Sequence, residues 1–245
     1  KAEGKDSVVD FSALRTFLDR NPADWNNEGT SSLTAKSSGS IVAPQLTTLS
    51  AITVTLDGTG TLPVSQYTAL TNGVLVVSGV DYSFPALADI SGTTVQVVGV
   101  AAVLDQVTNA AGVKITQSGG SLDLRRAASL SGSSLTINGG AIDLRAVTNI
   151  NGASFIVSGS STVSVPLAVE YTHTVGNVND FVRFQVTGAG SVLDLRNVRT
   201  LTGGNDRNDQ VMIEALSGGR IDLRAVTDIV DPATGDTTGR GVQVK

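Results

Sequence analysis

The sequence predicts an all-β protein that forms one parallel β-helix, or β-solenoid, as a single domain over residues 1–245. Three observations predict this fold. One pattern recurs about every 20 residues, apolar and polar residues alternate within each copy, and glycine-rich turns separate the alternating segments. The chain holds about ten copies, so we expect about ten coils of short strands and tight turns.

The repeat is clearest in residues 114–133 and 134–153, which share the tetrapeptide pattern of Ile142-Asp143-Leu144-Arg145. The Asp of this pattern, or the residue in its place, serves as the marker of each copy. It falls at Asp10, Val42, Pro63, Ser83, Val103, Asp123, Asp143, Ser164, Asp194 and Asp222. The regular coils therefore span 34–169, with a first coil and long loop in 1–33 and coils that carry loop inserts in 170–245.

Each copy has three apolar groups, of which the first two alternate with polar residues. Leu135 with Ile137 and Ile142 with Leu144 are typical of strands that bury one face. Gly139 and its neighbour Gly140 lie between them, where the chain must turn and a positive φ favours glycine. Successive coils of such strands stack about 4.8 Å apart, which predicts a rod on the order of 50 Å long.

Two alternatives to this interpretation remain open from the sequence. The spacing of Ile142, Leu144, Val147 and Ile150 also fits half of a leucine-rich repeat, although the asparagine expected there is absent and the connecting segment is short for a helix. The first twenty residues also fit a short amphipathic helix that caps the rod, with its apolar residues at helical spacing.

Composition excludes several classes of function. The net charge is −5, with 17 Lys+Arg against 22 Asp+Glu, which argues against nucleic acid as a partner. Cysteine is absent and His173 is the single histidine, so thiol chemistry and histidine-based catalysis are not expected. No apolar run approaches the roughly 20 residues that span a bilayer, so membrane insertion is not expected.

At the repeated residues, the sequence resembles the right-handed parallel β-helices of large secreted bacterial surface proteins of the adhesin and autotransporter-passenger types. The resemblance covers nearly the whole chain and is one of pattern and composition. It implies display outside the cell, at a bacterial cell surface, and adhesive or scaffold work. It assigns no site residue.

The two ends of the chain match complementary parts of one copy. Residues 241–245 match the opening strand of a copy, and residues 1–10 match the remainder. Open strand edges associate readily, so we expect stacking on copies of itself head to tail, or on an adjoining solenoid of the same polypeptide. A cut through a longer solenoid would leave the same edges. The expected assembly interface comprises Val8, Val9, Phe11, Val242 and Val244.

Four inserts lengthen the terminal copies at the same corner and are rich in Asp and Asn. Oxygen-rich loops are what Ca²⁺ requires, although these residue types are also ordinary turn formers. The candidate ligands are Asp24, Asp180, Asp206, Asp209, Asp231 and Asp236. Apart from this possible Ca²⁺, no cofactor is expected. Trp25, in the longest insert, is a candidate contact for a surface glycan, or else an anchor for its loop.

The outward Asp and Arg residues carry two interpretations. Stacked in register, Asp143 and Arg145 would form a charge lattice of mixed sign with the neighbouring copies. A polysaccharide lyase or hydrolase on such a face needs two carboxyls, one of raised pKa, and arginine neighbours favour the ionised form instead. We therefore expect a non-enzymatic structural or adhesive module of an extracellular fibre; the alternative is a carbohydrate-binding or polysaccharide-processing β-helix.

Overall fold

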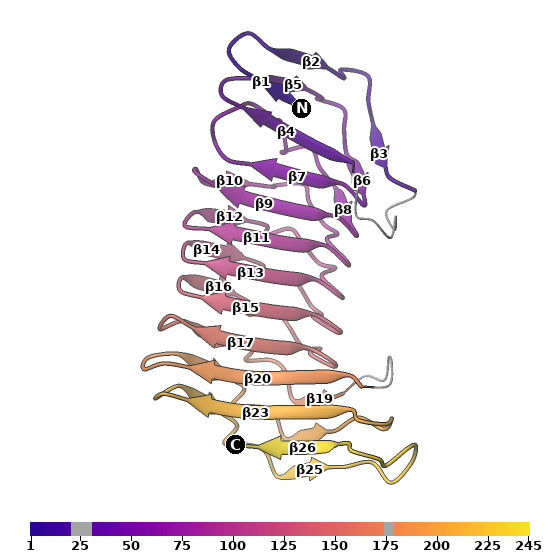
Figure 1. Cartoon of the computed structure of the whole chain (residues 1–245), viewed down its shortest axis with the longest axis vertical. Coiled ribbons are helices and arrows are strands. Elements are labelled where there is room, and N and C mark those ends of the chain that lie inside the picture. Colours follow the sequence, from indigo (N-terminus) through magenta and orange to yellow (C-terminus); the bar gives the residue numbers. More distant parts are fainter. Residues whose placement is uncertain (21–30, 174–178) are drawn as a thin grey trace.

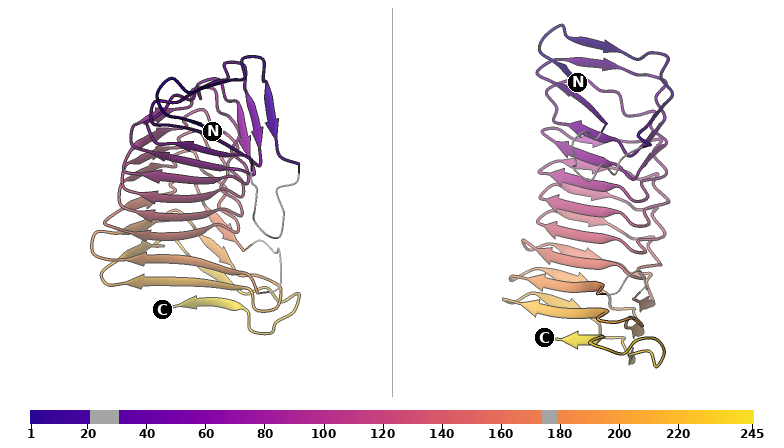
Figure 2. Two further views of the ribbon diagram at one scale, coloured as in Figure 1. Left: turned by 45° about the horizontal axis from the view of Figure 1, so that its top comes forward. Right: turned by 45° about the vertical axis from the view of Figure 1, so that its right-hand side comes forward.

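The computed structural model describes residues 1–20, 31–173 and 179–245, and within these ranges the chain forms strands and no helix. The strands stack one above another, with the N-terminal and C-terminal strands at opposite ends of the molecule (Figures 1 and 2). The all-β expectation is confirmed. In place of the alternative helix, the first twenty residues hold three short strands, β1 (Ala2–Glu3), β2 (Val8–Asp10) and β3 (Thr16–Leu18).

One long parallel sheet of 11 strands runs the length of the molecule. We call the stretch of chain from one of its strands to the next a rung. In order along the sheet, β1 is followed by β4 (Ser32–Lys36), β7 (Thr53–Leu56), β9 (Val74–Ser78), β11 (Thr94–Val98), β13 (Lys114–Ser118), β15 (Ser134–Asn138), β17 (Ser154–Ser158), β20 (Phe181–Thr187), β23 (Gln210–Leu216) and β26 (Gly241–Val244).

Shorter parallel sheets occupy the remainder of each rung. The strands that contain the marker residues form three of them: β2 with β5 (Ser40–Val42); β10 (Tyr82–Ser83), β12 (Ala101–Val103), β14 (Ser121–Asp123) and β16 (Ala141–Asp143); and β18 (Thr162–Ser164), β21 (Val192–Asp194) and β24 (Arg220–Asp222). The strands that follow them form two more: β3, β6 (Thr48–Ser50) and β8 (Ala69–Thr71); and β19 (Glu170–Thr172), β22 (Thr200–Thr202) and β25 (Asp228–Val230).

Register between rungs is strict. In the middle of the long sheet Leu75 pairs with Val95, Val95 with Ile115, Ile115 with Leu135 and Leu135 with Phe155, so each partner lies 20 residues further along. We call the residues at one position of successive rungs a column. This arrangement is compatible with a β-solenoid, because residues that are one repeat apart occupy the same column in successive rungs.

The core consists of columns of buried aliphatic side chains. Leu75, Val95 and Leu135 are fully buried, and each contacts members of its column in the rungs on both sides. Complete burial of such a side chain stabilises the fold by about 1.5–3 kcal/mol. In the C-terminal rungs aromatic rings join the core: Phe184 packs edge-on against Phe155 at 5.8 Å and against Tyr171 at 4.9 Å between ring centroids.

Polar side chains at the turns satisfy backbone groups. Thr93 and Ser133, both buried, donate hydrogen bonds to the carbonyl oxygens of Leu70 and Ala110 in the rung before. Gln117 takes an inward position between Val97 and Ile137, and its amide donates to the Ala141 carbonyl at 3.0 Å. These bonds tie one rung to another at its corners, where the strand ladders stop.

The long connections all lie at one corner of the molecule. Each connects a strand of one of the two sheets that follow the marker strands to a strand of the 11-stranded sheet. They join β3 to β4, β19 to β20, β22 to β23, and β25 to β26. The last three stack on one another: Asn179 N–H donates to the Arg207 carbonyl, and Asn208 N–H donates to the Thr238 carbonyl. Insertion at this corner leaves the paired columns uninterrupted.

The corner glycines offer a direct test of the stacking distance. Gly120 has a φ of +67°, and a Cβ there would lie 2.0 Å from the Val100 carbonyl oxygen of the preceding rung. Gly99 has a similar φ of +69°, but a Cβ would meet nothing within 4 Å. Gly99→Ala should therefore lose about 1–2 kcal/mol for the left-handed backbone, and Gly120→Ala clearly more. Equal losses in denaturant unfolding would contradict the close stacking of rungs.

Candidate functional site

A ladder of aspartate–arginine ion pairs lines one corner, just after the marker strands. Asp123 pairs in register with Asp143, and Asp194 with Asp222. Each aspartate binds the arginine two residues later in its own rung, so the lattice of mixed sign is built mainly from pairs within a rung. In the second of these pairs, Arg145 Nε donates to Asp143 Oδ1 at 2.9 Å and its Nη2 donates to Oδ2 at 2.5 Å.

These bonds hold the aspartates ionised. Hydrogen bonds from the Arg125, Arg145 and Arg196 guanidinium groups lower the pKa of Asp123, Asp143 and Asp194, respectively. The backbone amides of the same arginines lower these pKa values further, whereas partial burial of the carboxylates raises them. Hydrogen bonding to Arg224 lowers the pKa of Asp222 to about 2. The rungs also influence one another, because Arg125 lowers the pKa of Asp143 while Asp143 raises that of Asp123.

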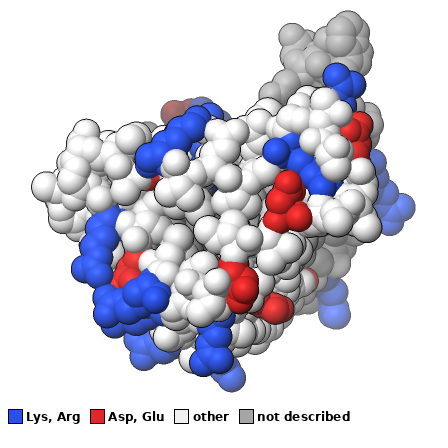
Figure 3. Space-filling view, turned by 90° about the horizontal axis from the view of Figure 1, so that it is seen from below, with Lys and Arg blue, Asp and Glu red and all other residues white. Residues whose placement is uncertain are grey.

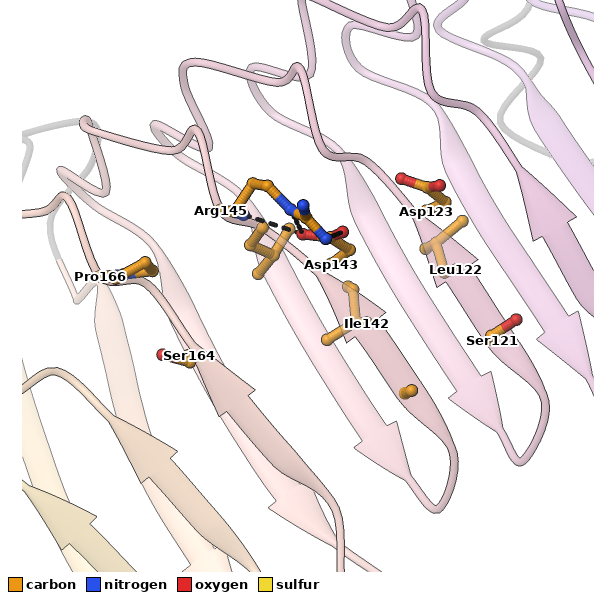
Figure 4. Close-up of a pocket in the computed structure, with 10 residues that line it drawn as sticks. Ser121, Leu122, Asp123, Ile142, Asp143, Arg145, Ser164 and Pro166 are labelled. Carbon is orange, nitrogen blue, oxygen red and sulfur yellow. Dashed lines mark hydrogen bonds and ion pairs between the residues drawn. The ribbon is translucent and has the colours of Figure 1, made fainter.

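The ladder is interrupted at the rung of β18, where Ser164 and Pro166 stand in place of the aspartate and arginine. A groove of about 450 Å³ opens beside this rung. Figure 4 shows Arg145 lying over Asp143, with Ser164 and Pro166 across the groove. Ile142, at an inward position, is only half-buried here, whereas the equivalent Leu122 is 1% exposed.

The groove marks a break in the marker sheets, because β16 ends one sheet and β18 begins another. An additional residue lies between them: Asn138 pairs with Ser158, 20 residues on, but Asp143 and Ser164 are 21 apart. The extra residue lies in the turn 159–161, where Ser160 has a φ of +60° and its amide and hydroxyl bond to the following rung. Among the described residues, the Leu144 amide makes no backbone hydrogen bond, whereas the equivalent Leu124 amide donates to Asp143.

The groove offers little for sugar chemistry. Its lining residues, all within the described part of the chain, include no aromatic ring on which a sugar could stack. Its two carboxyls, Asp123 and Asp143, are held ionised by their arginines, whereas a glycosidase needs one carboxyl of raised pKa.

The candidate calcium ligands lie in the stacked connections and make local hydrogen bonds. Asp209, fully buried, accepts hydrogen bonds from the backbone amides of Asp180 and Asp206. Asp231 pairs with Arg240 at 3.2 Å, and Asp236 accepts from the Thr238 amide. Within the described residues, no three acidic or histidine side chains are grouped to hold a metal ion. Calcium binding stays a prediction.

Two further candidates, Asp24 and Trp25, lie outside the described residues, so their surroundings carry no evidence for calcium or glycan binding. His173 directly follows β19 and is 2% exposed, continuing the alternation of buried Tyr171 and half-buried Thr172. Within the described residues neither ring nitrogen has a hydrogen-bond partner, and Nε2 lies 3.9 Å from Asp180 Oδ2.

The two end faces expose apolar residues at positions that are buried elsewhere. Four of the expected assembly residues, Val9, Phe11, Val242 and Val244, occupy such inward positions, while Val8 points to the outer face of β2. Phe11 is 41% exposed and Val244 69%, although Leu124 and Ile213, in their columns, are nearly fully buried. Figure 3 shows the C-terminal end, where uncharged atoms cover much of the surface.

Sequence reasoning missed other members of these faces. Partly buried Leu14 and Phe17 join the N-terminal face, and Ile221, Leu223 and Val226 join the C-terminal one. Exposed Leu18, Ile229 and Val230 lie beside them. Leu14, Phe17, Ile221, Leu223, Val226 and Ile229 could have been found from their inward places in the repeat, whereas Leu18 and Val230 lie at outward positions.

Protonation of the ladder should destabilise the fold. The folded pKa of Asp222 lies at about 2, below the ordinary value of about 3.9, so its stabilising effect is complete above pH 4 and disappears as the pH falls through 2. We expect the melting temperature of the wild type to fall more steeply between pH 4 and pH 2 than that of Asp222→Asn. Asp105→Asn serves as the control, because the Asp105 carboxylate accepts a hydrogen bond from the side-chain amide of Gln106 in place of an arginine. Parallel curves for wild type and Asp222→Asn would contradict the ion-pair interpretation.

The part of the chain that the structure describes holds no helix long and apolar enough to cross a membrane. Comparison with known proteins leaves the chain without an assigned relative, because no protein family, no curated protein and no solved structure matches it. The end faces and the aspartate–arginine ladder are therefore the features from which function is inferred.

Proposed function

We propose that this chain is a non-enzymatic structural or adhesive module of an extracellular fibre or giant bacterial surface protein, joined end to end through its terminal rungs. In this proposal residues 1–245 form a single β-solenoid of about ten coils, with loop inserts at one corner of the terminal coils. The end faces are the observation that supports it: among the described residues, inward apolar side chains of the first and last rungs, such as Phe11 and Val244, are exposed, whereas the same columns are buried in the middle rungs.

The mechanism is mechanical. Columns of buried side chains and continuous strand ladders make the molecule a stiff rod, and each rung is stabilised only by its neighbours. A further rung placed on either end would extend the same columns, so rods joined end to end gain the contacts that hold one rod together. The connections at one corner are then displayed at regular intervals, where weak contacts to a surface add through avidity.

The secreted location is supported by the resemblance in pattern and composition to bacterial surface β-helices. The absence of cysteine agrees with a fold that takes its stability from stacking and not from disulfides. In this proposal the aspartate–arginine ladder adds only modestly to stability, because its arginines are exposed to solvent and pair with aspartates of the same rung.

Charges placed at the end faces should weaken association. Val244→Glu and Phe11→Glu each put a carboxylate where the proposal buries an apolar side chain, and we expect association to need a concentration about tenfold higher or more. Val98→Glu is the matched control, because Val98 is 51% exposed in the middle of the long sheet.

Light scattering after size exclusion, with negative-stain microscopy, measures the effect. Wild type and Val98→Glu should form end-to-end chains of rods, and the two end variants shorter ones. A wild-type protein that stays strictly monomeric at every concentration would overturn the proposal.

A further inference from the structure

We propose that the junction between the rung of β15 and the rung of β17 is a hinge, at which two sides of the rod open while the long sheet stays paired. The rungs before and after the junction would move as two bodies, which meet between Ala153 and Ser154. The inference concerns the interior of the rod and is independent of end-to-end assembly.

Each rung has three sides, which we number from the long sheet. The marker strands lie on the second side, and the strands or single bridges that follow them lie on the third. On the first side the junction is complete, because all five residues of β15 pair with β17. On the second side, among the described residues, β16 and β18 are not paired.

Pairing is lost on the third side at the same junction. One column of this side is in register from Thr16 to Asn149, and again from Glu170 to Asp228, through strand pairs and single bridges. Asn149 and Glu170, which are consecutive members of this column, form no such pair within the described ranges. The two bodies are therefore connected by a strand ladder on one side only.

Backbone hydrogen bonds of the third side show the same interruption. The Thr148 amide donates to the Ala128 carbonyl of the rung before at 3.0 Å. The equivalent amide makes the same bond in every other rung from Thr47 to Thr227. The exception is Val169, whose amide makes no backbone hydrogen bond in the part of the chain that the structure describes. This bond is missing only where the hinge is proposed.

The loss of both sides distinguishes this junction from the others. The second side is also unpaired between the rungs of Pro63 and Ser83, but there the third side is closed by the bridge from Ala69 to Asp89. In the described part of the chain, no other junction between two complete rungs lacks pairing on both the second and the third side.

The structure shows the hinge in its closed position. Val147 and Ile150 of one rung, and Ala168 and Tyr171 of the next, are fully buried. The groove between β16 and β18 already opens the second side to solvent (Figure 4). Local opening begins where the fewest backbone bonds must break, so the second and third sides would separate here by rotation about β15 and β17. A rod that is otherwise stiff would then bend at one defined place.

One remaining backbone bond reports the opening. At the end of the third side the Gly152 amide donates to the Thr172 carbonyl at 2.9 Å, and opening would break this bond. Gly132 occupies the same position one rung earlier, and its amide donates to the Asn151 carbonyl at 2.8 Å. Gly132 is exposed and Gly152 is only half-buried, so exposure alone would make the Gly132 amide exchange faster. The hinge predicts the opposite order.

Amide hydrogen exchange, measured residue by residue by NMR, tests the hinge in the intact chain. The Gly152 amide should exchange about tenfold faster than the Gly132 amide, or more, because only the first of these bonds spans the hinge. The amides of β15 and β17 should exchange as slowly as those of β13, because the long sheet stays paired during opening.

A disulfide across the third side should lock the hinge. Asn149 and Glu170 are exposed, and the chain has no cysteine of its own, so Asn149→Cys with Glu170→Cys places one thiol on each side of the junction. Adjacent rungs lie about 4.8 Å apart, within the Cα separation of up to about 7 Å that a disulfide bridges. Oxidation should slow exchange of the Gly152 amide about tenfold, to the rate of Gly132, and reduction should restore the faster rate.

The matched control is Ser129→Cys with Asn149→Cys, one junction earlier, where a bridge already pairs the two residues. Its disulfide should leave the exchange rate of the Gly152 amide unchanged. Equal exchange of Gly152 and Gly132 in the wild type would overturn the hinge, as would the same slowing of Gly152 by both disulfides. Exchange of the β15 and β17 amides as fast as that of Gly152 would overturn it too, because whole rungs would then separate without a hinge.

Discussion

Parallel stacking in register is the interaction on which the molecule depends. A rung of about 20 residues cannot bury its apolar side chains alone, so Val95 is buried only because Leu75 and Ile115 lie on either side of it. The same neighbours satisfy the backbone groups of its strand. Packing and hydrogen bonding therefore impose one register, and a residue added within a strand would displace every column after it.

This constraint decides where the chain can vary. The long connections enter at one corner, between strands, where additional residues leave the columns aligned. The additional residue in the turn 159–161 comes between two strands as well, but it accompanies the loss of pairing between β16 and β18. There the aspartate–arginine pair gives way to Ser164 and Pro166, and Ile142 becomes half-exposed. The groove is thus a consequence of imperfect stacking, and its carboxylates Asp123 and Asp143 are each paired with an arginine.

The same constraint makes the end rungs the least satisfied part of the fold. Each has neighbours on one side only, and its inward positions, Phe11 and Val244 among them, expose apolar area that is buried in every middle rung. Many solenoids close such ends with a polar or charged cap.

Periodicity made much of this structure predictable. The alternation around Leu135 and Ile142 indicated strands, and the spacing of Asp123 and Asp143 indicated the register in which they pair. The expected charge lattice between neighbouring copies gives way mainly to pairs within a rung, because Arg145 lies just beyond the end of β16 and binds Asp143 there.

Sequence by itself therefore determined the strands and their register, because these depend on a local pattern repeated many times. Only the tertiary structure decided the burial of His173 and the break between β16 and β18. Each of these depends on the relation between rungs that are distant along the chain, and on where an irregular connection places its residues. That information is absent from any single repeat.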